Sequence, residues 1–440
     1  MRRVVLSAAT AVAVLGTTPM VAAPAARADE PTGVSLVSVA YDGEPASDSS
    51  HFPVVSGDGQ VVAFGSHAVN IVRQDFTNVY DIFVRDLRNG VSTRVSVATD
   101  GTPANAASYG AALSYDGRFV AFHSAASNLV PGDTNNASDV FVHDRQTGTT
   151  SRVSVATGGT QANGPSQNPQ LSADGRWVTF STTATNLAPG AVGSKSKVLL
   201  HDRETGTVTE VSVRPDGTSG TEDSGLPSIS ADGRYVGFIS ADPRIVPAPR
   251  FMAVNAYVRD VQSGTTVRVN ATSLSSLGYA IPKVGTPLLV SPDGRYATMF
   301  TDTAMVPEDT NRASDAYRIE MATGSVTRVS VGADGAQGDK ASGLTVTGAP
   351  MSTDGRYVAF DSEATNLVPG DTNGVRDIFV RDTVNGTTTL LSAGETPNTR
   401  PSYHPAISAD GSVAVFTTDG ALTANDTNRR NDVYLRRHQG

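Results

Sequence analysis

A four-residue turn motif recurs seven times along this chain and constrains its fold more than any other feature. Every copy reads Ser-x-Asp-Gly, and successive copies lie 56 to 61 residues apart. Self-similarity at a fixed period of this order is typical of solenoids and propellers. The turn aspartates are Asp58, Asp116, Asp174, Asp232, Asp293, Asp354 and Asp410.

The second copy shows what each repeat contains. A short apolar run, Ala111–Leu113, precedes the turn at Ser114–Gly117. Three further β-type runs follow at 118–124, 140–143 and 149–155, separated by a Pro/Gly/Asn-rich loop and a Gly-containing turn. Six residues after each turn aspartate stands a large apolar residue, which is Phe in every copy except the fifth, where it is Met299. Each repeat therefore predicts a four-stranded antiparallel sheet with a fixed packing position.

The two ends of the chain complete each other. The seventh copy stops after its third strand, at Asp432–Arg437. Ser35–Gly43 aligns at an offset of 58 residues with Thr93–Gly101, which is a fourth strand with its exit turn. The sequence therefore predicts an all-β fold, a seven-bladed β-propeller whose last blade is closed by the N-terminal strand Val34–Val39.

The repeat also carries a family resemblance. Ser291-Pro292-Asp293-Gly294-Arg295-Tyr296, followed by an apolar strand, a Tyr/Phe-rich strand and an Asp-x-x-Thr-Gly turn, resembles the TolB-type (WD40-like) β-propeller repeat. The resemblance covers essentially all of residues 34–440. It implies a propeller, often one that serves as a protein-interaction scaffold of the cell envelope.

Residues 1–28 have the pattern of a cleaved signal peptide. Arg2 and Arg3 precede the apolar run Val4–Leu15, and Ala26-Arg27-Ala28 is an A-x-A cleavage site. The apolar run is too short to span a bilayer. We predict export with cleavage after Ala28, leaving 29–440 as a single propeller domain that is secreted or associated with the cell wall. The chain has no cysteine, which excludes disulfides and a lipid-anchored N-terminal cysteine.

The charge balance bears on possible partners. The formal net charge is −9, and loss of the three arginines of residues 1–28 makes it −12. No basic stripe exists, which argues against nucleic acid or an anionic membrane as a partner. We expect a monomer that binds a protein or glycan at the cell envelope.

Arginine and aspartate recur at one end of the predicted blades. Arginines follow five of the turns, and aspartates end five of the third strands, so we expect structural ion pairs there, each contributing little if exposed. The residues are Arg118, Arg176, Arg234, Arg295 and Arg356, and Asp86, Asp144, Asp202, Asp260 and Asp382.

Acidic loops are predicted at the opposite end, between the second and third strands. Four copies carry D-x-N-x-x-x-D, whose carboxylate and amide oxygens suit Ca²⁺. The alternative, which we favour, is that Asp and Asn form Asx-turns that cap the loop. The third copy has Lys197 in place of the last aspartate, so at least one loop forms without a metal. The candidate metal ligands are Asp133, Asn135, Asp139, Asp309, Asn311, Asp315, Asp371, Asn373, Asp377, Asp426, Asn428 and Asp432.

The connections between blades, at this same end, are where the copies stop resembling one another. Because the scaffold needs the same features in every blade, variation here favours a binding site at the mouth of the central channel. The chemically rich positions fall in copies seven, one, two and three, which are contiguous around a closed ring. The predicted ligand-binding residues are Asp48, His51, Tyr109, Gln167, Asn168, Tyr403 and His404.

These mouth residues allow more than one role. Tyr109 and Tyr403 offer stacking surfaces, and His51 and His404 are hydrogen-bonding or titratable groups. A metal held by the two histidines is an alternative, although no third histidine obviously joins them in sequence. Another is that the side chains merely plug the mouth and bond to one another.

Three functional interpretations follow. The first is a secreted β-propeller that acts as a protein- or glycan-binding scaffold through the channel mouth. The second is a polysaccharide lyase or hydrolase of the propeller class with its site at the mouth. The third is a calcium-stabilised structural module. The chain has no G-x-S-x-G or H-E-x-x-H motif and no assignable catalytic residue, which favours the non-enzymatic interpretations.

Overall fold

The computed structural model of the chain describes residues 33–188, 195–246, 254–271, 280–282, 285–343, 349–395 and 398–438. The predicted signal peptide, residues 1–28, lies outside these ranges and stays a prediction. In the part of the chain that is described, no helix has the length and apolar character needed to cross a membrane.

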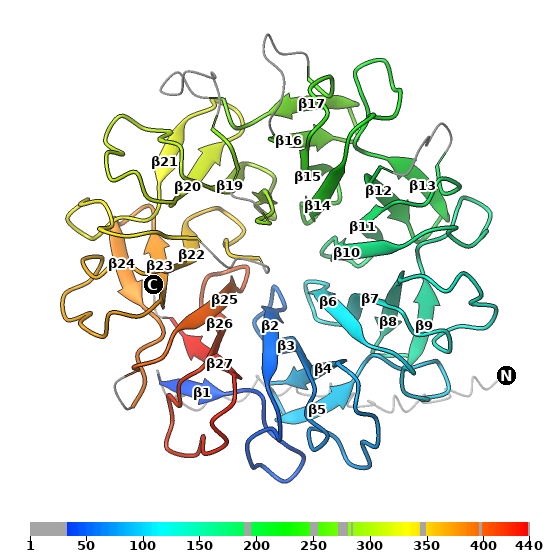
Figure 1. Cartoon of the computed structure of the whole chain (residues 1–440), viewed down its shortest axis with the longest axis horizontal. Coiled ribbons are helices and arrows are strands. Elements are labelled where there is room, and N and C mark those ends of the chain that lie inside the picture. Colours follow the sequence, from blue (N-terminus) through cyan, green and yellow to red (C-terminus); the bar gives the residue numbers. More distant parts are fainter. Residues whose placement is uncertain are drawn as a thin grey trace, which may run out of the picture. The chain divides into compact units, whose positions relative to one another are not determined.

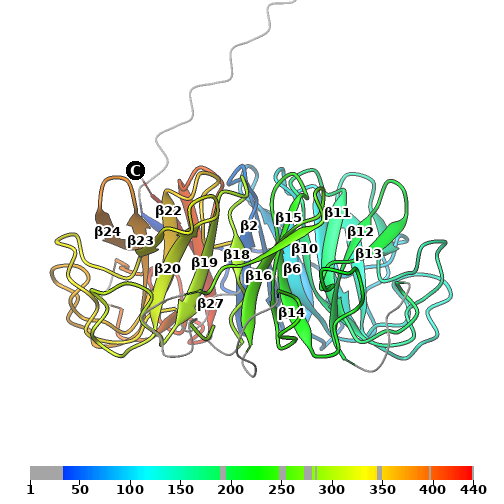
Figure 2. The ribbon, with the colours of Figure 1, turned by 90° about the horizontal axis from the view of Figure 1, so that it is seen from above.

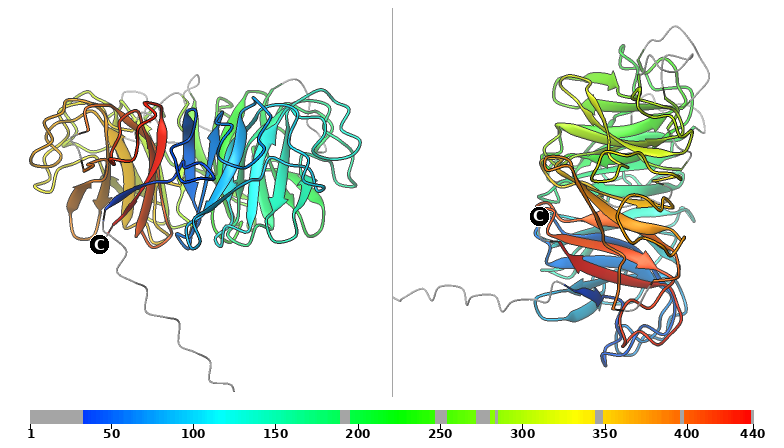
Figure 3. Two further views of the ribbon diagram at one scale, coloured as in Figure 1. Left: turned by 90° about the horizontal axis from the view of Figure 1, so that it is seen from below. Right: turned by 90° about the vertical axis from the view of Figure 1, so that its left-hand side faces the viewer.

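Seven antiparallel sheets are arranged as blades around a central axis, and the strands run across the thickness of the ring (Figures 1 to 3). Blade 1 consists of β2 (Ser50–Val55), β3 (Val61–Ser66), β4 (Asp81–Asp86) and β5 (Val91–Arg94); blade 2 of β6 (Ser108–Leu113), β7 (Phe119–Ser124), β8 (Asp139–Asp144) and β9 (Thr149–Arg152). Blade 3 consists of β10 (Ser166–Leu171), β11 (Trp177–Thr182), β12 (Lys197–Asp202) and β13 (Thr207–Glu210); blade 4 of β14 (Ser224–Ile229), β15 (Tyr235–Ser240), β16 (Asn255–Asp260) and β17 (Thr265–Arg268).

Blade 5 consists of β18 (Leu289–Val290), β19 (Tyr296–Thr301), β20 (Asp315–Glu320) and β21 (Val326–Arg328); blade 6 of β22 (Tyr357–Ser362), β23 (Asp377–Asp382) and β24 (Thr387–Leu390). Blade 7 consists of β25 (Ser402–Ile407), β26 (Val413–Thr418), β27 (Asp432–Arg437) and β1 (Val34–Leu36). In blade 6, the innermost position is marked by the isolated bridge between Met351 and Val358. The predicted seven-bladed, all-β propeller is confirmed.

The N-terminal strand closes the ring. β1 pairs antiparallel with β27, with Val34 opposite Arg436 and Leu36 opposite Tyr434. The pairing continues one residue past β1, because the Val37 amide donates to the Val433 carbonyl at 2.8 Å. The predicted closure of the last blade is therefore confirmed, with a strand shorter than Val34–Val39.

The repeated turn is held by its own side chains. In blade 2 the Ser114 hydroxyl donates to Asp116 at 2.8 Å and accepts the Phe119 amide at 2.9 Å. Gly117 has φ = 67°, a left-handed conformation that suits glycine. Arg118, next in sequence, reaches Asp144 at 2.7 Å. The same predicted ion pair forms in blades 3, 4 and 6, whereas Asp86 of blade 1 instead pairs with Arg88 at 2.5 Å.

The hydrophobic core lies between neighbouring blades. Phe64, for example, packs with Val62 of its own blade and with Val415 and Leu435 of blade 7. The residues at the repeated position, each at most 1% exposed, are Phe64, Phe122, Phe180, Phe238, Met299, Phe360 and Phe416. Seven such contacts rigidify the ring and hold its innermost strands around the channel.

Candidate functional site: the channel mouth

A bulge interrupts the innermost strand of five blades at the same place. In β2 the pairing with β3 shifts between His51 and Val54, and β6, β10, β14 and β25 shift equivalently. The residue inside each bulge has a left-handed backbone, and a proline follows it in four of the five blades, which suits a position outside the hydrogen-bonded ladder. These bulge residues are Phe52 (φ 53°), Gly110 (φ 68°), Asn168 (φ 55°), Leu226 (φ 50°) and His404 (φ 53°).

The bulge residues surround the mouth of the channel. A pocket of about 230 Å³ is lined there by Phe52, Tyr109, His123, Asn168 and Leu226, among others. Deeper along the axis, a second pocket of about 140 Å³ shares Val54, Gln170 and Leu289 with the first.

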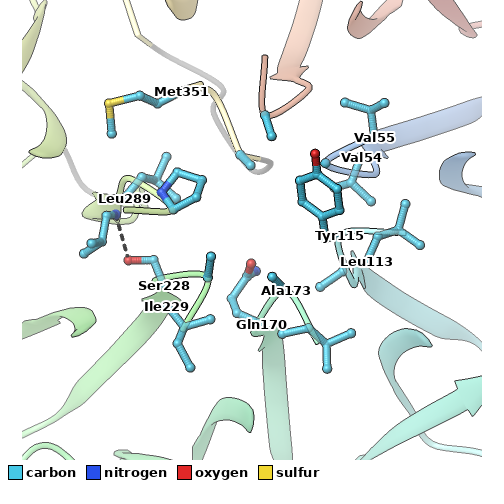
Figure 4. A pocket seen from close by; sticks show the side chains of 18 of the residues that line it. Val54, Val55, Leu113, Tyr115, Gln170, Ala173, Ser228, Ile229, Leu289 and Met351 are labelled. Carbon is cyan, nitrogen blue, oxygen red and sulfur yellow. Dashed lines mark hydrogen bonds between the residues drawn. The ribbon is translucent and has the colours of Figure 1, made fainter. Parts of the chain in front are cut away.

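The deeper pocket is mostly apolar. Leu113, Ile229 and Met351 line it, and Tyr115 and Gln170 supply its larger polar side chains (Figure 4). Both parts of the channel are therefore lined mainly by apolar groups, and the second pocket reaches the turns at the opposite end of the blades.

One row of rings joins blades 7 and 1 at the mouth. The ring centroids of Phe52 and His404 lie 4.4 Å apart, and Phe52 also lies 5.8 Å from the neighbouring His51. Tyr403 continues the row at 5.9 Å from His404. Four aromatic side chains from the predicted first and seventh copies thus form one continuous surface.

A second row joins blades 1 and 2. The rings of Tyr80 and Tyr109 stack at 4.9 Å and 19°. His67 packs edge-on against Tyr80 at 4.9 Å, and Tyr109 lies 5.9 Å from His123, which is its cross-strand partner.

Charged groups flank Tyr403. Its hydroxyl donates to Asp419 at 3.4 Å, and the Arg376 guanidinium lies 5.3 Å from its ring centroid. Arg376 is itself paired with Glu363 at 2.9 Å and with Asp361 at 3.6 Å. This end of the aromatic surface therefore carries both signs of charge.

Burial sets the protonation of the mouth histidines. It lowers the pKa of His404 to about 3 and that of His123 to about 4. Burial also lowers the pKa of His51, although the Asp419 carboxylate opposes this shift. At neutral pH these imidazoles are uncharged, so they act as aromatic surfaces and hydrogen-bonding groups rather than as cations.

Two predicted mouth residues lie apart from the aromatic rows. Asp48 is paired with Arg430 at 3.7 Å, and its carboxylate accepts the Ser49 amide. Gln167 lines a separate pocket of about 460 Å³, together with Ser181 and Leu226. The structure thus brings His51, Tyr403 and His404 into one row and Tyr109 into the other, and places Asn168 in the mouth pocket.

Sequence reasoning missed Phe52, His67, Tyr80 and His123. His67 and His123 belong to the second row and not to the row that holds His51 and His404. The signal was present in the second strands. His123 occupies a position where blade 1 has Gly65 and blade 3 has Ser181. Variation between the copies, the criterion that was applied to the connections between blades, therefore also identifies His123.

The acidic loops adopt Asx-turn geometry. In each of the four loops the asparagine Oδ1 accepts the amide two residues on, at 2.7 to 3.0 Å. The last aspartate accepts a hydroxyl, at 2.5 to 2.6 Å, from the serine that stands two residues after the end of the fourth strand. Within the described ranges, no three His, Asp or Glu side chains are gathered as a metal site. The asparagine and the last aspartate of the four acidic loops are Asn135/Asp139, Asn311/Asp315, Asn373/Asp377 and Asn428/Asp432.

Comparison with known proteins extends the fold assignment. No family model matches the chain, and neither does any curated protein. Among solved structures, the chain is similar to an oligogalacturonate lyase from Vibrio parahaemolyticus, with 14% identity, 92% of this chain and 96% of that chain covered, and a TM-score of 0.52. It is also similar to TolB from Acinetobacter baumannii, with 15% identity, 82% and 77% coverage, and a TM-score of 0.39. The first of these similarities shows a shared fold, in agreement with the propeller that the repeats predict.

Proposed function

We propose that this protein is a secreted or cell-envelope binding scaffold that holds a protein segment or a glycan against the aromatic surface of its channel mouth. The observation that carries the proposal is the backbone of the bulge residues. A left-handed conformation is strained for a bulky residue such as Phe52, at a cost of roughly 1 to 3 kcal/mol. Blade 2 uses Gly110 at this place, so the bulge itself does not need a side chain.

The retained side chains therefore have a purpose other than forming the bulge. Phe52 is 40% exposed and Tyr109 is 43% exposed, so each offers a ring face to the mouth as well as to its neighbours. Large rigid rings that lose little conformational entropy on contact are suited to holding a partner. The uncharged histidines beside them add hydrogen-bonding capacity without adding positive charge.

The variant Phe52→Gly tests this role. It relieves the left-handed strain and removes a half-exposed ring, so we expect unchanged or higher stability together with loss of binding. Binding is measured on an array of defined oligosaccharides and with a displayed peptide library, which separates the glycan from the protein alternative.

Leu226→Gly is the matched control, because it relieves the same strain on the opposite side of the mouth. We expect it to retain binding. If Phe52→Gly instead lowers the melting temperature and keeps the binding profile, the ring is a packing element and the proposal fails.

A second candidate is a polysaccharide lyase or hydrolase. It is favoured by the Tyr403 hydroxyl, which donates to Asp419 at 3.4 Å, and by the electrostatic effect of Asp419 on His51, because all three groups can exchange protons. The propeller of similar fold is an oligogalacturonate lyase, so oligogalacturonate is the first substrate to assay, by the ultraviolet absorbance of unsaturated products. Product that forms with the wild type but not with His51→Asn would favour this candidate over pure binding.

Export is part of the same proposal. The predicted cleavage after Ala28 is tested by N-terminal sequencing of protein recovered from the medium and the cell wall. A mature chain that begins at Asp29 is expected, and an uncleaved cytoplasmic product would contradict the localisation. Light scattering of that material tests the expectation of a monomer.

A further inference from the structure

One position on the fourth strand separates the acidic loop of blade 6 from those of blades 1, 2 and 5. It lies in register opposite an aromatic residue of the third strand. Blades 1, 2 and 5 have an arginine there, whereas blade 6 has Leu390. The register pairs are Phe83 with Arg94, Phe141 with Arg152, Tyr317 with Arg328, and Phe379 with Leu390.

The arginine supplies the positive charge that the acidic loop needs. Arg152 lies 3.4 Å from both Asp133 and Asp139. In blade 1, Arg94 lies 2.5 Å from Asp75 and 3.6 Å from Asp81. Buried carboxylates are tolerated when they are paired in this way. In these blades, therefore, an arginine side chain provides the positive charge that balances the two carboxylates of the loop.

Blade 6 has a cavity at this place instead. The cavity measures about 180 Å³ and is lined by Asp371, Asn373, Asp377, Leu390, Ser392 and Asn398, among others. None of the described residues that line it is basic. Lys340, which acts electrostatically on Asp371, is exposed, and Asp339 opposes its effect.

The two carboxylates of this cavity are deeply buried. Asp371 is 7% exposed, and its Oδ1 has no hydrogen-bond partner among the residues that the structure describes. Asp377 is 1% exposed and accepts hydrogen bonds from Asn373 at 2.6 Å and from Ser392 at 2.5 Å.

Blade 7 also has a leucine at this position and meets the need only in part, since Asp426 Oδ1 and Asp432 Oδ2 have no hydrogen-bond partner among the described residues. Leu36 stands at the same position, but its register partner is Tyr434, whose hydroxyl donates to Asp426 at 2.6 Å. In blade 6 the equivalent residue is Phe379, which has no hydroxyl. Among these acidic loops, blade 6 is the one that combines leucine with phenylalanine and so lacks both the arginine and the tyrosine.

We infer that the blade 6 cavity binds a divalent cation, with Asp371 and Asp377 as its charged ligands. The lining offers oxygen ligands of the carboxylate, hydroxyl and amide types and no imidazole or thiolate, a chemistry that suits Ca²⁺ better than Zn²⁺. Water completes the coordination, since Ca²⁺ takes six to eight oxygen ligands. The inference is independent of the function proposed for the mouth.

The test uses the full mature protein, stripped with a chelator and titrated with Ca²⁺ by calorimetry, with thermal unfolding as a second readout. A ligand that binds only the folded state raises its stability, so a saturable rise in the melting temperature is expected. Asp371→Asn should weaken Ca²⁺ binding at least about tenfold, because it removes one of two charged ligands.

Two further variants keep the inference falsifiable without relying on that loss alone. Asp133→Asn, the matched change in blade 2, should leave the Ca²⁺ affinity unchanged, because Arg152 occupies that loop. Leu390→Arg should abolish the Ca²⁺ response and raise the stability of the chelator-treated protein, since it installs the arginine of blade 2. A wild-type protein that does not respond to Ca²⁺, or an equal loss in Asp133→Asn and Asp371→Asn, would overturn the inference.

Discussion

Blades 2 and 3 satisfy one buried position with opposite charges. In blade 2, the third strand begins with Asp139 and the fourth ends with Arg152, 3.4 Å away. In blade 3, the equivalent residues are Lys197 and Glu210, so the signs are exchanged; the Lys197 ammonium donates to the Gly220 carbonyl, and Lys197 and Glu210 interact electrostatically. Lys197 is 2% exposed, so its charge has little access to water. The difference teaches that opposite charges can fill these two places in either order, so that neither sign is required in a given strand.

The comparison of blades 2 and 3 also changes the interpretation of Lys197. Taken alone, a lysine in place of the last aspartate only shows that a loop forms without a metal. Paired with Glu210, it is one half of a charge reversal that preserves the electrostatics of the blade. Glu210 in turn accepts the Ser219 hydroxyl at 2.9 Å, which helps to satisfy the buried carboxylate.

The largest loss of stability is expected when Lys197 and residue 210 of blade 3 are given the same charge. Glu210→Arg places a second cation beside Lys197, and removing one partner of a buried pair typically costs about 3 to 5 kcal/mol. Adding Lys197→Asp rebuilds the arrangement of blade 2 and should recover much of that loss. Urea unfolding of the two single variants and the double variant measures the coupling. If the effects of the two substitutions on the free energy of unfolding are simply additive, residues 197 and 210 are not coupled, and blade 3 is not equivalent to blade 2 at this position.

A smaller effect is expected when blade 2 is made to resemble blade 6. Arg152→Leu leaves Asp133 and Asp139 buried without their cation, and we expect a loss of about 3 kcal/mol. The variant should also gain a stabilising response to Ca²⁺ that the wild-type loop lacks. Arg152→Lys is the control, because it keeps the charge and should retain most of the stability. If Arg152→Lys loses as much stability as Arg152→Leu, the shape of the arginine side chain, rather than its charge, stabilises this loop.

The architecture could be predicted from the sequence because it depends on features that every copy shares. The turn motif and the buried position of a large apolar residue recur in each blade, and the offset of 58 residues located β1 against β27. What escaped prediction lies in contacts between positions that differ from copy to copy. Tyr80 stacks on Tyr109 of the next blade, and a ring contact across a blade boundary has no sequence spacing of its own.

The bulges escaped prediction for a different reason. A proline after Phe52 or Asn168 was visible, but a left-handed phenylalanine is disfavoured locally and exists only because the surrounding sheet imposes it. Similarly, Lys197 was noticed as an exception, whereas Glu210 was not, because the compensating residue lies thirteen positions later on another strand.

The smallest change in stability is expected for an ion pair between arginine and aspartate at the surface. The Arg118 side chain is 39% exposed and pairs with Asp144 at 2.7 Å, so Arg118→Ala should change the stability at neutral pH little compared with Arg152→Leu. Its signature is a pH dependence. Hydrogen bonds from Arg118 lower the pKa of Asp144 to about 2, below the value of the unfolded chain.

The unfolded chain therefore binds more protons at this site than the folded protein between about pH 4 and about pH 2. The stability that the pair contributes is present above this window and is lost as the pH falls through it. In Arg118→Ala the pKa of Asp144 rises toward the unfolded value, so the loss of stability on acidification should be shallower than in the wild type. Urea unfolding at a series of pH values measures the slope, and Arg176→Ala should match it, because hydrogen bonds from Arg176 likewise lower the pKa of Asp202 to about 2. An unchanged slope in both variants would mean that these surface pairs do not hold the carboxylates in their charged form.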